Sequence, residues 1–361
     1  MKSKTAILTI KLILIILNSC SIFENKPDDE IIEITFDRSS FPNATMLTAE
    51  VIDFNEPLNP MAFDIIYDTL ILSRNRQGDP YYLELYNMKN NELVMRFAKR
   101  GRGPNEYLSA YYSNKTSIDS SFFLLDLTQN RASKFDIDSL LQFGENYQPY
   151  WFEIPYFAGI DVAMLDSSTA LIFNKFYINN DEYSNNLNNP IFAFNIFEDT
   201  DFSEIGEDYE FFTFNVSDSY IAVSPNKETI WVLYQKDNRI DIFNKDLKRI
   251  KTLYGPEEFS PEYYLRDGLD GNHVSMKKRT RTFWRCFYTS DYIYVIYIGE
   301  YDREQMRPRD IYKFAWNGSL LHRYQLDRDL NTIYIDSNKE YIYGTAVKSG
   351  EYPELVRYKI K

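Results

Sequence analysis

The chain of 361 residues carries 40 Lys and Arg against 53 Asp and Glu, which gives a formal net charge of −13 at pH 7. This acidic balance excludes DNA and RNA as general partners, because phosphate backbones are bound by basic surfaces. Two Cys and two His are too few for a cysteine-built zinc site or a disulfide framework. An aromatic content of 17% favours strands over helices.

The N-terminus has the pattern of an export signal. Lys2 and Lys4 precede an apolar run, and residues 17–20 (LNSC) follow it, as in secretory signal peptides. The apolar run is shorter than the roughly 20 residues that span a bilayer. The junction resembles the lipobox of bacterial lipoproteins. This resemblance implies that residues 1–19 are removed as a signal peptide and that Cys20 becomes lipidated, which gives a stable membrane anchor.

Residues 20–40 are predicted to form a flexible tether after the lipidated cysteine. The run 24–30 (ENKPDDE) is polar and charged, which is typical of solvated linkers. A similar acidic run acts as a surface-export signal in some outer-membrane lipoproteins of the Bacteroidetes. We therefore expect attachment to the bacterial outer membrane, and both the periplasmic and the outward orientation stay open.

From residue 41 onward, short alternating strands are separated by polar turns. The clearest unit contains residues 291–299 (DYIYVIYIG), 310–316 (DIYKFAW) and 319–326 (SLLHRYQL). Asn-Gly at residues 317–318 is a strong hairpin signal between two such strands. Similar units recur about every 50 residues, which is typical of a β-propeller with four strands per blade. Six units begin near residues 58, 109, 159, 216, 280 and 329.

The last unit offers three strands and lacks a fourth. Residues 45–53 (TMLTAEVID) read as an unassigned strand at the other end of the domain. If this strand joins the last blade, the ring is closed and two sheet edges disappear. The prediction is therefore an all-β protein, in which residues 41–361 form a six-bladed β-propeller of four antiparallel strands per blade. A seven-bladed ring, a jelly roll and a pair of sandwiches stay open as alternatives.

One segment carries a family resemblance. Residues 100–107 (RGRGPNEY) resemble the Gly-Arg-Gly-Pro-Gly-Glu-Phe motif of Bacteroidetes six-bladed, TolB-like propeller lipoproteins. Asn105 stands where that motif has its third glycine, and Tyr107 stands where it has phenylalanine. Residues 293–345 also look like the last two blades of that family. The resemblance implies a membrane-anchored propeller and implies no established reaction.

The sequence shows no catalytic constellation, so we expect a protein that is not an enzyme and uses no cofactor or metal. There is no Gly-x-Ser-x-Gly elbow and no His-Glu-x-x-His zinc motif. His273 is expected in a loop and His322 on an outer strand. Cys286, within the apolar run 282–288 (TFWRCFY), is predicted to be a buried thiol. The glycines of residues 101–103 are predicted to form a structural turn at positive φ.

Propeller connectivity places basic loops on one face. In a blade with strands A to D from the axis outward, the B–C loops and the loops from D to the next A share a face. We predict that this face engages a partner, through residues that comprise Arg74, Arg76, Arg100, Arg102, Glu106, Arg279, Arg281, Trp284 and Arg309.

The expected partner is an envelope protein or an anionic glycan or peptide, because guanidinium groups match carboxylates and phosphates. The sequence thus predicts a binding or scaffolding lipoprotein. Pairing of these arginines with local acids stays open, as does a lyase or glycoside hydrolase that acts on acidic polysaccharide. Two short motifs, Asp68-Thr69-Leu70 and Asp138-Ser139-Leu140, resemble the O-glycosylation acceptor of the Bacteroidetes, which implies modification of Thr69 and Ser139.

Overall fold

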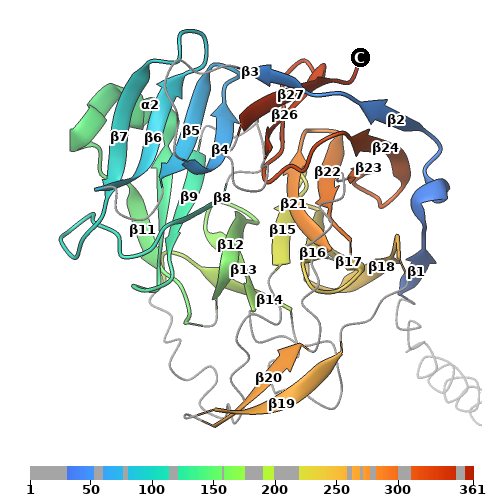
Figure 1. Cartoon of the computed structure of the whole chain (residues 1–361). Helices are drawn as coiled ribbons and strands as arrows, with labels where there is room; N and C mark the ends of the chain where they lie inside the picture. Colours follow the sequence, from blue (N-terminus) through green and yellow to red (C-terminus); the bar gives the residue numbers. More distant parts are fainter. Residues whose placement is uncertain are drawn as a thin grey trace, which may run out of the picture. The chain divides into compact units, whose positions relative to one another are not determined.

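Six antiparallel sheets follow one another along the chain and form the blades of a propeller (Figure 1). The computed structural model describes residues 31–52, 60–75, 80–113, 121–156, 158–174, 190–198, 219–257, 262–268, 271–276, 282–299, 310–346 and 354–361. The predicted six-bladed β-propeller is confirmed.

The first three blades, each written from its innermost strand outward, come from residues 60–195. Blade 1 consists of β4 (Pro60–Ile66), β5 (Leu70–Asn75), β6 (Tyr81–Asn87) and β7 (Leu93–Lys99). Blade 2 consists of β8 (Tyr111–Ser113), β9 (Ser121–Asp126), β10 (Arg131–Asp136) and β11 (Tyr150–Glu153). Blade 3 consists, among the described residues, of β12 (Ala158–Met164), β13 (Thr169–Asn174) and β14 (Ile191–Asn195).

The other three blades follow in the same order. Blade 4 is built from β15 (Ser219–Val223), β16 (Thr229–Tyr234), β17 (Arg239–Asn244) and β18 (Arg249–Tyr254). Blade 5 is built from β21 (Phe283–Tyr288), β22 (Tyr292–Tyr297), β23 (Asp310–Ala315) and β24 (Leu320–Leu326). Blade 6 is built from β25 (Tyr334–Ile335), β26 (Tyr341–Ala346), β27 (Glu354–Lys359) and β3 (Glu50–Ile52).

The strands form where β-branched and aromatic residues concentrate, as in β16 (TIWVLY) and β22 (YIYVIY). Both of these strands are almost wholly buried, because each blade packs against its two neighbours. The Asn-Gly hairpin between β23 and β24 forms as predicted. Gly318 adopts φ +89° there, and its N–H donates to the carbonyl of Ala315 at 2.9 Å.

Helical and irregular elements are few in the described part of the chain. They comprise the α-helix α2 (Ile137–Phe143) and the 3-10 turns η1 (Arg38–Ser40) and η2 (Gly144–Asn146). No helix in the part of the chain that the structure describes is both long and apolar enough to cross a membrane. A two-stranded hairpin of β19 (Tyr263–Gly268) and β20 (Gly271–Met276), which was not expected from the sequence, lies in the connection between blades 4 and 5.

The chain before blade 1 forms a belt along outer blade edges, and we call residues 32–52 the N-terminal belt. Its strand β1 (Ile32–Thr35) adjoins β18 of blade 4, and β2 (Ala44–Leu47) pairs in parallel with β24 of blade 5. Its last strand, β3, pairs antiparallel with β27 and completes blade 6. Figure 1 shows this blue segment passing from one blade to the next. The three strands cover sheet edges that would otherwise be open.

The predicted closure by an N-terminal strand is thus confirmed, but the expected single strand 45–53 is divided. Only β3 joins the last blade, whereas β2 joins blade 5. The carboxylate of Asp327 accepts the N–H of Ala49 at 3.1 Å between the two strands, and this contact turns the chain from one blade to the other.

The belt begins at Ile32, before the expected boundary at residue 41. Phe36 and Phe41 are buried in the core between blades 4 and 5. The ring of Phe41 stacks on Tyr312 with 4.7 Å between the centroids. Burying an aromatic side chain stabilises a fold by about 2 kcal/mol, so this segment is held as part of the propeller. Cys20 and most of the expected tether lie outside the described residues.

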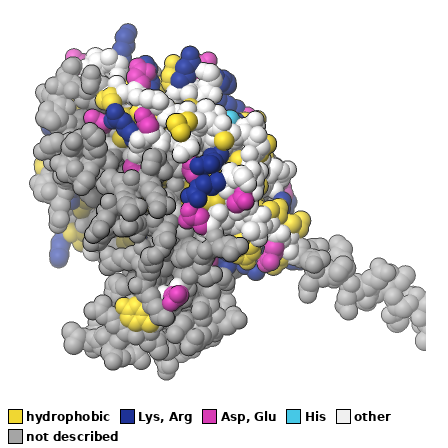
Figure 2. Space-filling view, turned by 45° about the vertical axis from the view of Figure 1, so that its right-hand side comes forward, with side chains coloured by type: hydrophobic (Ala, Val, Ile, Leu, Met, Phe, Trp, Pro, Cys, Tyr) yellow, Lys and Arg dark blue, Asp and Glu magenta, His cyan; other side chains and the backbone are white. Residues whose placement is uncertain are grey.

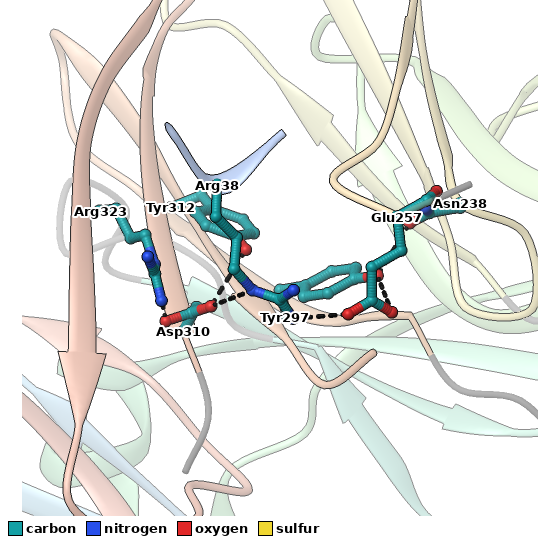
Figure 3. Close-up of polar contacts among 7 residues, drawn as sticks. All are labelled: Arg38, Asn238, Glu257, Tyr297, Asp310, Tyr312 and Arg323. Carbon is teal, nitrogen blue, oxygen red and sulfur yellow. Dashed lines mark hydrogen bonds and ion pairs between the residues drawn. The ribbon is translucent and has the colours of Figure 1, made fainter. Parts of the chain in front are cut away.

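Arg38 fastens the belt between blades 4 and 5 (Figure 3). Its guanidinium donates to Glu257 at 2.6 Å and to Asp310 at 3.1 Å. Asp310 also accepts from Tyr312 at 3.1 Å and from Arg323 at 3.0 Å. Behind the belt, Gly255 approaches so closely that a Cβ atom there would lie 2.0 Å from the carbonyl oxygen of Phe36.

Candidate functional site

A polar pocket lies among the innermost strands of the propeller. Its lining comes from β5, β8, β12, β15 and β21, and consists of Arg74, Tyr111, Tyr112, Ser113, Ile160, Asp161, Tyr220, Arg285 and Cys286. Because β8, β12, β15 and β21 are the inner strands of four successive blades, we call it the axial pocket. Its space measures about 470 Å³, including the part open to solvent. Tyr111 is 36% exposed, so the lining reaches the surface.

Two arginines meet in the axial pocket. The Nε atoms of Arg74 and Arg285 are buried and have no hydrogen-bond partner among the described residues. Neither guanidinium forms an ion pair with a carboxylate in the described ranges. The guanidinium of Arg74 lies 5.0 Å from the ring centre of Tyr111, and that of Arg285 lies 6.0 Å from that of Tyr112. Burial, together with the nearby charge of Arg285, lowers the pKa of Arg74.

Two acids stand near these arginines, and they differ in what they bind. Asp161 ties three blades together, because its carboxylate accepts from the Ser113 hydroxyl at 2.6 Å and from the Ile221 N–H at 2.7 Å. Asp64 is 5% exposed and accepts the N–H of its neighbour Ile65 at 2.9 Å. Burial raises the pKa of Asp64 to about 7, although the charge of Arg285 opposes this rise.

The chemistry that this arrangement offers is anion binding. Leaving a buried charge without a partner is costly, so two guanidinium groups that share a pocket favour an added negative group. Burial raises the pKa of Tyr112, which keeps its hydroxyl protonated and so unable to accept a proton as a phenolate. In the ranges that the structure describes, no three His, Cys, Asp or Glu side chains gather closely enough to hold a metal ion.

Of the predicted site residues, Arg74 reaches the axial pocket and the other described ones lie elsewhere. Arg100 lies over the ring of Tyr82 at 3.6 Å, and Arg102 is exposed. Trp284 donates its indole N–H to the carbonyl of Asn331 at 3.1 Å and packs against the core. A further four predicted residues lie outside the described part of the chain, namely Arg76, Arg279, Arg281 and Arg309.

Glu106 shapes the turn between blades 1 and 2. Its carboxylate accepts the N–H of Gly103 at 2.8 Å and pairs with Lys99 at 2.9 Å, and the backbone N–H bond is the main cause of its lowered pKa. Gly101 has φ +156°, and a Cβ atom there would lie 1.9 Å from Oε2 of Glu106. Asn105, at φ 62°, is the second residue of this turn in the left-handed region, whereas Gly103 is not. The motif thus forms a turn, with positive φ at residues 101 and 105 instead of 101 and 103.

The other side chains singled out from sequence lie at varied positions. Cys286 is a buried free thiol, as predicted, and contributes to the pocket lining. His322 lies on β24, as predicted, within 2.9 Å of the Thr45 hydroxyl of the belt. His273 lies on β20 and not in the expected loop. Thr69 is exposed in the β4–β5 turn, and Ser139 is half-buried in the first turn of α2. Their modification stays a prediction.

Arg285, Asp64, Asp161 and Tyr112 are not among the residues predicted from sequence to form the site. Each lies on an innermost strand, where the surrounding sequence is otherwise largely apolar or aromatic. A single charge inside such a strand, as in β12 (AGIDVAM) or β21 (FWRCFY), was the available signal. Trp284 packs against the core whereas its neighbour Arg285 lines the pocket, at a point where the pairing of β21 with β22 shifts register between Phe283 and Arg285.

The outer surface contrasts with this pocket. On the face shown in Figure 2, the Lys and Arg side chains of the described residues are interspersed with Asp and Glu, and no large patch of one sign is visible among them. The axial pocket is a place where two buried guanidinium groups of the described residues meet.

Comparisons with known proteins agree with the fold. The family model described as TolB-like 6-blade propeller-like matches residues 37–338. Among proteins with curated descriptions, none matches this chain. A solved structure of an exported protein from Bacteroides fragilis NCTC 9343 is similar at 12% identity with a TM-score of 0.53, and the match covers 92% of this chain and 100% of that chain.

A second solved structure, a DUF4221 member from Bacteroides vulgatus ATCC 8482, is similar at 9% identity with a TM-score of 0.51. That match covers 87% of this chain and 96% of the other. Likenesses at such low identity concern the fold alone. The family match extends over most of the six blades, and the chain therefore belongs to the TolB-like six-bladed propeller family.

Proposed function

We propose that this protein is an exported lipoprotein without catalytic activity that binds an anionic ligand, or an acidic group of an envelope partner, in the axial pocket. The observation that carries this proposal is the pair Arg74 and Arg285, whose buried Nε atoms have no hydrogen-bond partner among the described residues. An anion that enters the pocket supplies the acceptors that these donors lack.

The surroundings support a site that is preorganised. Asp161 holds Ser113 of β8 and the backbone of Ile221 in β15, and this fixes the spacing of three blades around the pocket. Tyr111 and Tyr220 add aromatic faces to the lining. A rigid lining reduces the entropy that is lost on binding, which favours selective recognition of a small ligand.

Binding is favoured over turnover because the carboxylate that lines the pocket, that of Asp161, is engaged by hydrogen bonds from Ser113 and Ile221. A lyase that acts on acidic polysaccharide needs a base beside the carbon that is deprotonated, and the raised pKa of Tyr112 opposes this role. An enzyme assay keeps the alternative testable. Uronic-acid polymers are incubated with the protein, and the appearance of absorbance from unsaturated products would contradict the non-catalytic assignment.

The membrane anchor belongs to the same proposal. The lipobox-like residues 17–20 support lipidation of Cys20, and one of the structurally similar proteins is described as exported. We expect the wild-type chain to incorporate a labelled fatty acid in cells and Cys20→Ser not to incorporate it. Protease treatment of intact cells then distinguishes an outward orientation from a periplasmic one.

The ligand experiment is a calorimetric screen of the full chain against acidic sugars, peptides with a free C-terminus, phosphate and sulfate. We expect at least one anion to bind, and Arg285→Met to abolish this binding. Arg96→Met is the matched control, because Arg96 pairs with Glu84 at 2.6 Å within blade 1 and does not line the pocket. Failure of every anion in the screen, or equal binding by Arg285→Met, would refute the proposed ligand class.

Envelope partners are tested in parallel by cross-linking the native protein in its own membrane and identifying the products by mass spectrometry. A partner that is captured by the wild-type chain and lost from Arg285→Met supports recognition of an acidic group of that partner. A partner captured equally by both chains binds elsewhere and contradicts the pocket as the docking site.

A further inference from the structure

Asp64 is a buried acid that the proposed function does not yet explain. It lies on β4, and the N–H of Ile65 is its one hydrogen-bond donor among the described residues. No ion-pair partner stands within 4 Å of it in the part of the chain that the structure describes. The groups whose electrostatic field reaches Asp64 are Arg285 from β21, Tyr112 from β8 and Tyr334 from β25.

The charges around the axial pocket depend on the state of this acid. With Asp64 ionised, the guanidinium groups of Arg74 and Arg285 stand beside two carboxylates, those of Asp64 and Asp161. The formal balance is then zero, and an entering anion meets a like charge at Asp64. With Asp64 protonated, the balance is +1, and one negative charge neutralises the site. Because uncompensated charge in a buried site is costly, a monoanion and a proton are favoured together.

We propose that the axial pocket holds one carboxylate group of an organic monoanion between Arg74 and Arg285, and that Asp64 is protonated in the complex. This inference rests on the proposed function and specifies its ligand class. A dianion such as sulfate leaves the site with an excess negative charge. A planar carboxylate matches the two-pronged donor geometry of a guanidinium, and the rings of Tyr111 and Tyr220 suit the apolar face of a sugar acid.

The strength of the coupling follows from the titration of Asp64. Burial raises its pKa to about 7, so the protonated fraction falls from about 0.9 at about pH 6 to about 0.1 at about pH 8. An affinity that is proportional to this fraction changes about ten-fold across that interval. Wild-type protein is thus expected to bind the anion more tightly at about pH 6. At about pH 8, binding of the anion is expected to be accompanied by uptake of a proton by Asp64.

The test is calorimetric titration of the full chain with D-glucuronate at about pH 6 and about pH 8, with the ligand raised to about 10 mM because one charge pair gives modest affinity. D-Glucose, which lacks the carboxylate, is the ligand control. We expect glucuronate binding that is about ten-fold tighter at the lower pH. We also expect proton uptake at the higher pH, measured from the heats in two buffers with different ionisation enthalpies.

The variants separate this inference from the proposed function. Asp64→Asn mimics the protonated acid and is expected to bind equally at both pH values, at the affinity that wild type reaches at low pH. Arg74→Met and Arg285→Met are expected to lose binding, and Arg96→Met to keep it. If Arg285→Met does not fold, the pH profiles of wild type and Asp64→Asn decide the question alone.

Each contrary outcome has a distinct meaning. Arginine-dependent glucuronate binding with the same affinity at both pH values overturns the proton coupling and leaves the proposed function standing. Full pH dependence of binding by Asp64→Asn also overturns the proton coupling and leaves the proposed function standing. Tighter binding of phosphate or sulfate than of glucuronate overturns the carboxylate assignment alone. Absence of binding by any anion overturns both the inference and the proposed function.

Discussion

Replacing Arg38 with methionine is expected to loosen the N-terminal belt while leaving the six blades folded. Arg38 donates to Glu257 at 2.6 Å and to Asp310 at 3.1 Å, with its own side chain 41% exposed and that of Asp310 7% exposed (Figure 3). Exposed ion pairs contribute at most about 1 kcal/mol, and a hydrogen bond to a buried charge contributes about 1.5 to 3 kcal/mol.

Both carboxylates keep other partners in this variant. Asp310 retains Arg323 and Tyr312, and Glu257 retains Tyr297, so neither is left as a bare buried charge. We therefore expect a loss of about 2 kcal/mol in the free energy of unfolding. The entropy of unfolding grows with chain length, so this loss corresponds to a decrease of about 3 °C in Tm for a domain of this size.

Hydrogen exchange distinguishes a loosened belt from a general loss of stability. Amides of β1 and β2 are expected to exchange faster in Arg38→Met, because the belt opens locally before the blades unfold. The control is Arg96→Met, which removes an ion pair of the same 2.6 Å length inside blade 1 and should leave belt exchange unchanged. Equal belt exchange in wild type and Arg38→Met would refute the assignment of Arg38 as the fastening contact.

Further substitutions test the buried contacts. Phe41→Ala should lower the free energy of unfolding by about 3 kcal/mol in chemical denaturation, since its ring is buried against Tyr312. Met46→Ala is the control. Its side chain is 74% exposed, so the free energy of unfolding should change by under about 0.5 kcal/mol. Asp126→Ala should cost about 3 kcal/mol by the same measurement, because the buried carboxylate accepts four backbone N–H groups in blade 2. Asp64 has a raised pKa of about 7 in the fold, so native protein binds the proton more tightly than the unfolded chain. Stability should then fall by about 1.4 kcal/mol per pH unit from about pH 4 to about pH 7 relative to Asp64→Asn, and parallel stability–pH curves of the two proteins would contradict this.

Much of the fold is predictable from local sequence. The alternation of apolar and polar residues, the spacing of the units and the Asn-Gly hairpin depend on contacts between residues close in sequence. The unit starts near residues 58, 216 and 280 accordingly lie within a few residues of β4, β15 and β21. Completion of blade 6 by an N-terminal strand also follows, because the sixth unit visibly lacks a strand.

The path of the N-terminal belt does not depend on contacts between residues close in sequence. Residues 32–40 are polar and apolar in mixture and read as a linker. Phe36, within it, and Phe41, just after it, nevertheless pack between blades 4 and 5 on residues far later in the sequence, such as Tyr312 and Phe314. Packing between segments so distant in the chain leaves no pattern in the local sequence, because neither segment's sequence depends on that of the other. The parallel pairing of β2 with β24 has the same origin.

By itself, the sequence determined the propeller class, since this follows from periodicity and connectivity, whereas the gathering of arginine-bearing loops on one face stays a prediction. Only the tertiary structure decided which charges meet. Arg74 and Arg285 come from blades 1 and 5, and Asp64 and Asp161 come from blades 1 and 3. The closure of six twisted sheets around one axis brings them together, and no spacing along the chain expresses that convergence. Glu106 shows the reverse case, because its motif is visible in the sequence but is used for a turn.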